Sequence, residues 1–197
     1  MRITRNRPSV TLPSCKYDAD GLPTRFFNPG ELDTLLQLFE SVDARVIVEF
    51  GCHEGRNAAA ALRNLPAVER YVGVDVAPGY VTTMAVQRNE VPAQPGRLAA
   101  HDPRFELIVK PRGTFDLVTD DLPQADAVFI DADHSRKGVE HDTMLALAIV
   151  KPRGGIVIWH DDNCLPVVEV TQTLNDFCGN GMRIEHVAGT WLAFMRV

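Results

Sequence analysis

Short apolar runs alternate with longer amphipathic stretches along most of the chain. Five runs rich in β-branched and aromatic residues predict strands, at 46–49, 71–75, 105–109, 127–130 and 156–159. Apolar residues three or four positions apart predict helices at 28–39, 56–65, 79–89, 135–150 and 165–177, and a short helical link is expected at 115–122. Asn28-Pro29-Gly30-Glu31 predicts the start of the first helix, and Ser135 is expected to cap the fourth. The segments 182–187 and 190–196 alternate around Ala188-Gly189 and predict a closing hairpin. Strand and helix therefore follow each other five times before the hairpin.

This alternation predicts an α/β fold, in which a doubly wound, mostly parallel sheet is covered by helices on both faces. The C-terminal hairpin contributes an antiparallel edge, which brings the expected sheet to seven strands. The chain has 197 residues, enough for one hydrophobic core. We expect residues 28–197 to form a single domain and residues 1–27 to form an N-terminal arm with one short strand. The arm is interpreted as a solvated tail, or alternatively as a substrate or subunit contact.

Composition narrows the class of partner. The formal net charge of −6 argues against a nucleic acid bound mainly through its phosphates. The sequence shows no secretory signal and no long apolar span, which favours a cytoplasmic protein without a membrane partner. The scattered cysteines are expected to be reduced thiols: Cys15, Cys52, Cys164 and Cys178. An N-terminal arm is also compatible with a homodimer.

The segment 44–55 joins the first predicted strand to a glycine turn, and an alanine-rich helix follows. Gly51 and Gly55 allow backbone to approach a ligand without an intervening Cβ. The spacing from Glu49 is Glu-x-Gly-x-x-x-Gly, whereas dinucleotide-binding turns have G-x-G-x-x-G. Glu49 and Glu54 disfavour an anionic pyrophosphate and suit a ligand with ammonium and sulfonium groups. Cys52, in the middle of the turn, is interpreted as a small packing residue.

Polar residues follow the predicted strands at their carboxyl ends, where ligands bind in a parallel sheet. Asp75 follows the second strand and can accept hydrogen bonds from ribose hydroxyls, a role that dinucleotide enzymes also use. Acids and histidines follow the fourth and fifth strands: Asp131, Asp133, His134, His160, Asp161 and Asp162. Because these strand ends meet at one edge of the sheet, the sequence predicts a single acid-rich site there.

Two strand ends carry longer motifs, Val-Phe-Ile-Asp131-Ala-Asp133-His134 and Lys151-Pro-Arg-Gly-Gly-Ile-Val-Ile-Trp-His160-Asp161. With the glycine turn, they resemble class I S-adenosylmethionine-dependent methyltransferases, specifically the small-molecule families with I-D-x-D-H and H-D motifs. The resemblance covers about residues 46–162. It implies a Rossmann-like fold, S-adenosylmethionine as cofactor, and methylation of a small-molecule acceptor at a hydroxyl oxygen. This sequence departs from the family pattern by an arginine inside the usual K-P-G-G and by the spacing of the third and fourth strands.

The resemblance also implies roles for individual residues. It assigns cofactor contacts to Glu49, Gly51, Cys52, His53, Gly55, Asp75 and Asp131. The altered spacing leaves the adenine contact open among Arg112, Gly113 and Thr114.

An alcohol acceptor must lose a proton, either to a positioned base or with the help of a divalent cation. The candidate bases are Asp133 and His134. Metal-dependent relatives imply Mg²⁺ or Mn²⁺ on Asp131, His160 and Asp161. Because His160 departs from the usual acid, a shifted pair of Asp161 and Asp162 stays open. Magnesium prefers oxygen ligands, whereas an imidazole favours manganese, iron or zinc.

Three other functions fit parts of the pattern. An enzyme similar to cephalosporin hydroxylases would share the fold and the acid-rich rim. A non-catalytic module could bind the cofactor and act only through interactions. An NAD-binding Rossmann protein is disfavoured by the glycine spacing and Glu49. Trp159 and Trp191 are interpreted as core residues in strands, and Phe26 and Phe27 as one wall of an acceptor pocket.

Overall fold

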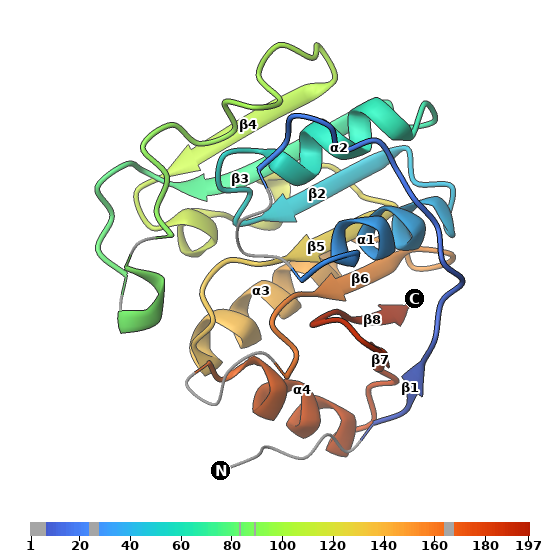
Figure 1. The fold of residues 1–197 in the computed structure, drawn as a ribbon. Helices are drawn as coiled ribbons and strands as arrows, with labels where there is room; N and C mark the ends of the chain where they lie inside the picture. Colours follow the sequence, from blue (N-terminus) through green and yellow to red (C-terminus); the bar gives the residue numbers. More distant parts are fainter. Residues whose placement is uncertain (1–6, 24–27, 83, 89, 164–167) are drawn as a thin grey trace.

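The computed structural model describes residues 7–23, 28–82, 84–88, 90–163 and 168–197 of the chain (Figure 1). Its strands form one sheet in the order β1-β7-β8-β6-β5-β2-β3-β4. Their bounds are β1 Ser9–Val10, β2 Val46–Phe50, β3 Arg70–Val76, β4 Phe105–Lys110, β5 Ala127–Ile130, β6 Ile156–Trp159, β7 Glu185–Val187 and β8 Ala193–Arg196. β8 runs antiparallel to both β6 and β7, and the other pairs are parallel. The carboxyl ends of β2, β3, β5 and β6 therefore share one edge.

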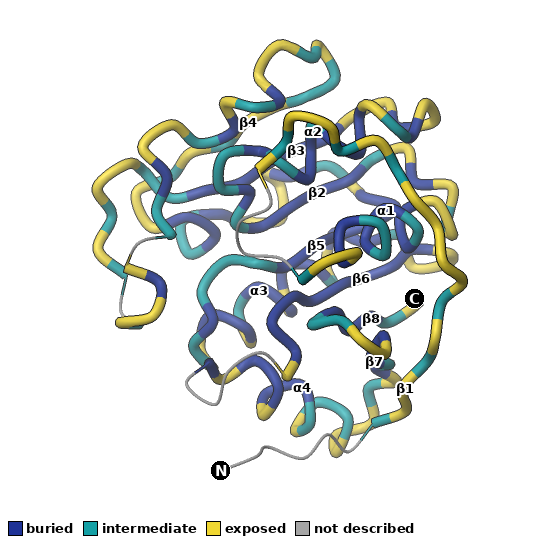
Figure 2. Tube along the Cα trace, in the orientation of Figure 1, coloured by how far each residue is buried: buried dark blue, intermediate teal, exposed yellow. Residues whose placement is uncertain are grey.

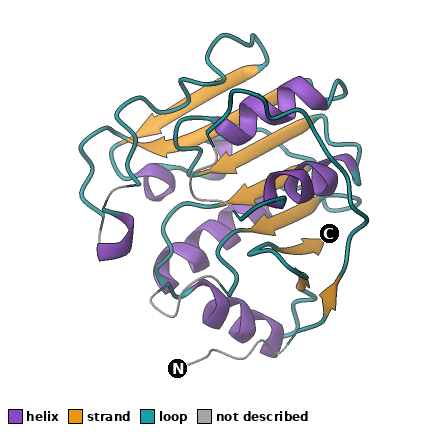
Figure 3. Cartoon of the chain, in the orientation of Figure 1, coloured by secondary structure: helices purple, strands orange, loops and turns teal. Residues whose placement is uncertain are grey.

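Helices lie on both faces of the sheet (Figure 3). The α-helices are α1 Glu31–Glu40, α2 Arg56–Asn64, α3 Arg136–Ile149 and α4 Val170–Gly179, and the 3₁₀ turns are η1 Ala85–Gln87, η2 Gly113–Asp116 and η3 Thr119–Asp121. α1 and α2 pack on one face, and α3 and α4 pack on the other. This is the doubly wound arrangement that the alternation of strands and helices predicts.

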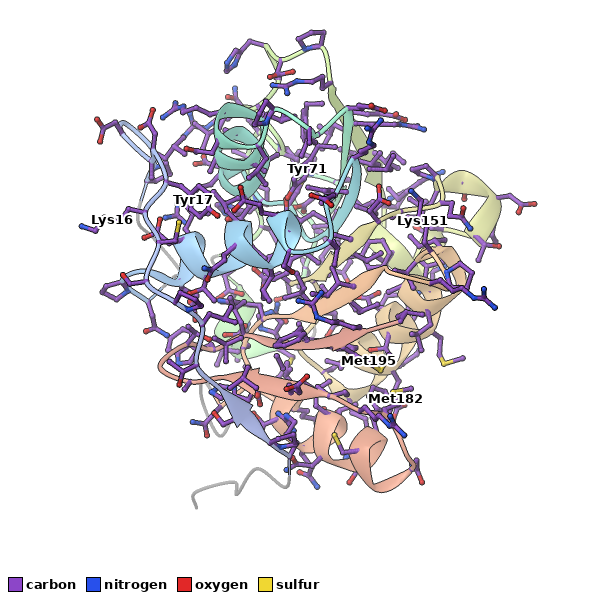
Figure 4. The ribbon with its side chains drawn as sticks, turned by 90° about the vertical axis from the view of Figure 1, so that its right-hand side faces the viewer. Lys16, Tyr17, Tyr71, Lys151, Met182 and Met195 are labelled. Atoms are coloured by element: carbon purple, nitrogen blue, oxygen red, sulfur yellow. The ribbon has the colours of Figure 1, made fainter. Side chains whose placement is uncertain are left out.

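Successive residues of the central strands divide between two hydrophobic cores. Ile47 and Phe129 pack beneath α1 and α2, whereas their neighbours Val48 and Val128 pack against α3 and α4. All four are fully buried, as the dark central strands of Figure 2 show. Strands buried on both faces need apolar residues at consecutive positions, which explains their β-branched runs. Tyr71 of β3 belongs to the α1 and α2 side and is also fully buried (Figure 4).

Most sequence-predicted elements are confirmed. The fourth and fifth predicted strands, 127–130 and 156–159, have the predicted bounds. α3 begins after Ser135, whose hydroxyl accepts a hydrogen bond from the Gly138 N–H at 3.1 Å. The sheet has one strand more than the predicted seven, because Ser9 and Val10 of the arm pair in parallel with β7.

Four helix predictions need correction. No α-helix occurs among the described residues of 79–89, where the only regular element is the short turn η1. α1 begins at Glu31 and not at Asn28, because Gly30 before it has a left-handed backbone with φ +81°. The segment 115–122 forms 3₁₀ turns at η2 and η3. The helix predicted from Leu165 begins at Val170, and residues 164–167 lie outside the described part.

The described part of the N-terminal arm packs on the domain. The side chain of Arg7 is 1% exposed and forms an ion pair with Asp162, which is itself fully buried. Arg7 also donates a hydrogen bond to Asn175 Oδ1 at 2.6 Å, and His186 Nδ1 lies 2.7 Å from Asp162 Oδ2. Further along the arm, the Tyr17 hydroxyl donates to Glu40 of α1 at 2.8 Å (Figure 4). The solvated-tail interpretation is therefore wrong for this part of the arm.

Two other expectations concern cysteines and membranes. Among the described cysteines, Cys15, Cys52 and Cys178 are free thiols, and Cys164 lies outside the described residues. Within the described residues, none of the helices has the length and hydropathy needed to cross a membrane.

Candidate active site

A cavity of about 340 Å³ opens at the carboxyl ends of β2, β3, β5 and β6. Residues predicted from the sequence form much of its lining: Gly51, His53, Asp75, Asp131, Asp133, His134, His160 and Asp161. The three adenine candidates Arg112, Gly113 and Thr114 line it too. The fold therefore brings the acids at the carboxyl ends of β3, β5 and β6 together around one space.

The glycine turn after β2 lies tightly against the end of β5. Gly51 has φ +83°, and a Cβ added there would lie 2.1 Å from the Asp131 carbonyl oxygen. The Gly51 and Cys52 N–H groups both donate to the Val74 carbonyl, at 2.8 and 3.1 Å. Only glycine satisfies the left-handed backbone and the close approach together. The turn is thus held between β3 and β5, where Gly51 lines the cavity.

The carboxylate of Asp75 is held by two backbone donors. His53 N–H donates to its Oδ2 at 2.6 Å, and Val76 N–H donates to its Oδ1 at 2.7 Å. Burial raises the pKa of Asp75 to about 6, against the opposing effect of these hydrogen bonds. The group is therefore mostly ionised at neutral pH. Each oxygen can accept further hydrogen bonds from a ligand, because a carboxylate oxygen has two lone pairs.

Three predicted cofactor residues are not among the described residues that line the cavity: Glu49, Cys52 and Gly55. Glu49 is fully buried and accepts hydrogen bonds from Asn57 Nδ2 at 2.7 Å and the Tyr71 hydroxyl at 2.9 Å. Burial raises the pKa of Glu49 to about 8. Cys52 packs against Gly73, and Gly55 begins α2 against Gly96. Their direct contact with a cofactor stays a prediction.

Asp131 and Asp161 bracket two imidazoles. His134 Nε2 lies 3.3 Å from Asp131 Oδ1, and His134 Nδ1 lies 3.0 Å from Asp161 Oδ2. His160 Nδ1 lies 3.2 Å from Asp131 Oδ1 and 3.5 Å from Asp161 Oδ2. Asp161 has an unusual left-handed backbone, φ +57°, which directs its side chain toward the cluster. Two acids and two histidines thus share one network at the edge of the cavity.

This network shifts the pKa values of its members. Burial lowers the pKa of His160, but the charges of Asp131 and Asp161 outweigh it and raise the pKa well above its usual value. Burial also lowers the pKa of His134, but the hydrogen bond to Asp131 and the charges of Asp161 and Asp131 outweigh it and raise the pKa above its usual value. Burial raises the pKa of Asp131, whereas the positive imidazole of His160 lowers it, with a net decrease. The two acids therefore stabilise positive charge on both imidazoles.

The same residues fit a divalent cation. One ligand atom each from Asp131, His160 and Asp161 lies within 4.8 Å of the others. Oxygen and imidazole donors in such a group suit a first-row transition metal. The second nitrogen of His160 faces Glu31 Oε2 at 3.3 Å, the outer carboxylate partner that metal-binding histidines usually have. The predicted metal ligands are thus close enough to share one ion.

Two predicted residues have partners outside the cluster of Asp131, His134, His160 and Asp161. Asp162 forms the buried ion pair with Arg7 and the contact with His186, so the structure favours Asp161 over the shifted pair of Asp161 and Asp162. Asp133 accepts a hydrogen bond from Ser135 N–H at 2.8 Å, and its Cβ lies against Gly138 at the start of α3. Of the two candidate bases, His134 is therefore the one that contacts both acids.

Sequence reasoning missed three residues of the site. Glu31, predicted only as a helix-start residue, is fully buried and contacts His160. Gln87 links two segments, because its Nε2 donates to the Ala132 carbonyl at 2.7 Å and its Oε1 accepts from His134 N–H at 3.2 Å. Trp191 is not in a strand or in the core; it lines the cavity, half-buried. The signal that could have revealed Glu31 is its position as an acid on the otherwise apolar stripe of α1. Phe26 and Phe27 lie outside the described residues.

The strand order, the glycine turn and the acid-rich cavity define a class I methyltransferase with a Rossmann-like fold. The model of the methyltransferase-domain family matches residues 48–161, more than half of the chain. The protein therefore belongs to this family of S-adenosylmethionine-dependent enzymes, as the motifs predicted. The search of curated protein sequences found no match to this chain.

Solved structures with a similar fold include three methyltransferases. The O-methyltransferase of Bacillus cereus in complex with S-adenosylhomocysteine is 18% identical with a TM-score of 0.55, covering 91% of this chain and 86% of that one. TomG of Streptomyces achromogenes, in complex with S-adenosylmethionine, is 18% identical with a TM-score of 0.58, covering 86% and 81%. PaMTH1 of Podospora anserina, bound to S-adenosylhomocysteine, is 15% identical with a TM-score of 0.61, covering 86% and 78%. At these identities the likeness concerns the fold.

Proposed function

We propose that the protein transfers a methyl group from S-adenosylmethionine to a hydroxyl oxygen of a small-molecule acceptor. The observation that carries the proposal is one cavity lined both by Asp75 and by the cluster of Asp131, His134, His160 and Asp161. A methyl transfer needs groups that position the cofactor and groups that take the acceptor's proton. Asp75 suits the first role, through the ribose, and the cluster suits the second. The structures of TomG and of the Bacillus cereus enzyme, with bound S-adenosylmethionine and S-adenosylhomocysteine, support the choice of cofactor.

In this proposal, the residues around the turn hold the cofactor. The cofactor supplies a sulfonium methyl group, which an oxygen nucleophile can attack. Asp75 accepts hydrogen bonds from the ribose hydroxyls, in an orientation set by the backbone N–H groups of His53 and Val76. Gly51 leaves its side of the cavity free of a side chain. Arg112, Gly113 and Thr114 border the adenine, and the acids of the rim favour a cationic ligand.

The acceptor's proton passes to the cluster. His134, between Asp131 and Asp161, accepts the proton, and the two carboxylates stabilise the resulting positive charge. Asp133 has a structural role in this proposal, because it accepts the hydrogen bond from Ser135 N–H and so fixes the loop that carries His134. A divalent cation on Asp131, His160 and Asp161 would lower the pKa of an acceptor hydroxyl.

Calorimetry followed by a transfer assay tests the proposal. S-adenosylhomocysteine should bind at micromolar concentration or tighter, and NAD should not bind. Methyl transfer from labelled S-adenosylmethionine to a panel of phenols, catechols and sugars should then give a product heavier by one methyl group. The Asp131→Asn variant should keep its cofactor affinity and lose roughly 100-fold or more in turnover.

Other outcomes identify the alternatives. A product heavier by one oxygen atom would indicate chemistry like that of cephalosporin hydroxylases. Cofactor binding without turnover on any acceptor would indicate an interaction module. Unchanged turnover in Asp131→Asn would remove Asp131 from the mechanism. The homodimer expected from the arm stays a prediction, which light scattering would test.

A further inference from the structure

Glu31 is an acid buried where its helix is otherwise apolar. It comes from α1, outside the matched family segment 48–161, and is fully buried beside Leu35 on the same helix face. Three described residues hold its carboxylate. Asn28 donates from its N–H to Oε2 at 2.9 Å and from Nδ2 to Oε1 at 3.4 Å, Trp191 N–H donates to Oε1, and His160 Nε2 lies 3.3 Å from Oε2. Burying a carboxylate is costly unless such partners compensate for the lost water. Of these partners, His160 and Trp191 line the cavity, and His160 is the one whose side chain also contacts Asp131 and Asp161.

The contact with Glu31 determines which nitrogen of His160 faces the cluster. Glu31 offers only acceptor atoms when ionised, so the Nε2 that faces it carries a hydrogen. Nδ1 is then directed toward Asp131 Oδ1 at 3.2 Å and Asp161 Oδ2 at 3.5 Å. Ligand atoms bonded to one ion at about 2.1 Å are separated by about 3.0 to 3.4 Å in octahedral or tetrahedral geometry. The two separations from Nδ1 lie in or close to this range, and one ligand atom from each of the three residues lies within 4.8 Å of the others.

We propose that Glu31 is a positioning residue that presents His160 Nδ1 as a metal ligand, so that the site selects manganese, iron, cobalt or zinc over magnesium and calcium. The proposal deepens the proposed function and rests on its metal-assisted form. A nitrogen ligand lowers the preference for hard cations, and the outer carboxylate raises the basicity of the imidazole. A second imidazole, His134, borders the same two carboxylates, outside the group of three ligands.

Metal binding by the full chain tests this directly. After removal of metals, the protein is dialysed against an equimolar mixture of Mn²⁺, Co²⁺, Zn²⁺, Mg²⁺ and Ca²⁺, and the retained metals are measured by mass spectrometry. Transition metal should be retained at about one equivalent, and a 100-fold excess of Mg²⁺ should not displace it. Co²⁺ should give visible absorption bands at wavelengths that differ from those of the aquo ion, because a nitrogen ligand increases the ligand-field splitting.

Two variants separate positioning from general structure. Glu31→Gln keeps the shape and removes the charge, and it should weaken Co²⁺ affinity about 10- to 100-fold without changing S-adenosylhomocysteine affinity. Glu40→Gln, at the exposed end of the same helix, should change neither. His160→Asn exchanges the imidazole for an amide oxygen ligand and should shift the preference toward Mg²⁺.

Preferential retention of Mg²⁺ or Ca²⁺ by the natural chain, no metal retention, or unchanged Co²⁺ affinity in Glu31→Gln would overturn the proposal. If Glu31→Gln fails to fold, the selectivity of the natural chain and of His160→Asn decides. Binding of S-adenosylhomocysteine with no metal selectivity would leave the proposed function intact and remove this inference. Selective metal binding without S-adenosylhomocysteine binding would support this inference and contradict the proposed function.

Discussion

Gly51 and Asp131 approach each other so closely that no side chain fits between them. A Cβ on Gly51 would lie 2.1 Å from the Asp131 carbonyl oxygen and 2.6 Å from its carbonyl carbon. These residues end β2 and β5, which are adjacent and parallel strands. The proposed cofactor turn therefore packs directly against the backbone that carries Asp131 of the cluster. A change at this point should disturb both.

Gly51→Ala should destabilise the protein severely, by about 4 kcal/mol or more, because it adds a backbone clash to the strain of φ +83°. Gly79→Ala is the matched control, since Gly79 has φ +86° but nothing within 4 Å of its added Cβ. The control should lose only about 1 kcal/mol. Chemical denaturation of both variants measures the difference, and equal losses would show that the contact with Asp131 does not matter.

Asp75→Asn should weaken the binding of S-adenosylhomocysteine by about 10- to 100-fold, because a charge-assisted hydrogen bond to a ribose hydroxyl is lost. The fold should persist, since the amide oxygen can still accept one of the two backbone hydrogen bonds from His53 and Val76. Calorimetry measures the affinity, and Asp120→Asn at an exposed position serves as control. An unchanged affinity would place the ribose elsewhere.

Arg7→Ala should cost about 3 to 5 kcal/mol, because it leaves the fully buried Asp162 without its main counter-charge. Adding Asp162→Asn to this variant should recover part of the loss, since the uncompensated charge is then removed. Arg45→Ala breaks an exposed pair with Glu69 and should cost less than about 1 kcal/mol. Thermal and urea unfolding test the series. A loss for Arg7→Ala as small as that for Arg45→Ala would mean that the arm is not part of the domain.

Asp142 of α3 should make stability depend on pH. Burial raises its pKa to about 7 from an ordinary 3.8, against the opposing effect of the Thr114 hydroxyl. The folded state therefore keeps a proton that the unfolded state releases above about pH 4, so this contribution to stability is lost as the pH rises toward 7.

Asp142→Asn should remove that dependence. The variant should gain stability over the natural chain by on the order of 2 kcal/mol at pH 8, and the gain should shrink at pH 5. Unfolding measured at both pH values gives the comparison. A gain of the same size at pH 5 and pH 8 would show that Asp142 is ionised in the folded state throughout this range.

Local patterns in the sequence were sufficient for most of the architecture. The apolar runs at 127–130 and 156–159 predicted strands with their observed bounds, because strands buried on both faces tolerate few polar residues. Ser135 predicted the start of α3 through its capping hydroxyl. Ligands bind at the carboxyl ends of parallel strands, and this rule predicted that one site would hold several polar residues. The structure places them in one cavity: Asp75, Asp131, His134, His160 and Asp161.

The failures occurred where a distant contact overrides a local preference. The segment 79–89 has a helical pattern, yet the Gln87 side chain bonds to Ala132 and to His134 N–H, and the only regular element among its described residues is a 3₁₀ turn. The sequence pattern also does not distinguish Asp161 from Asp162. The left-handed backbone at Asp161 turns that side chain toward the imidazoles, while Arg7 and His186 hold Asp162 in the core.

The sequence by itself thus determined the α/β class, the methyltransferase family and the edge of the sheet that carries the site. Periodicity and strand-end motifs are local properties, so they can be recognised in the sequence without knowledge of the fold. Only the tertiary structure decided that Glu31 of α1 contacts His160, that Trp191 lines the cavity, and that Arg7 neutralises Asp162. Each of these contacts joins residues more than a hundred positions apart or on different elements. Their partners are set by how the layers pack, which no local pattern records.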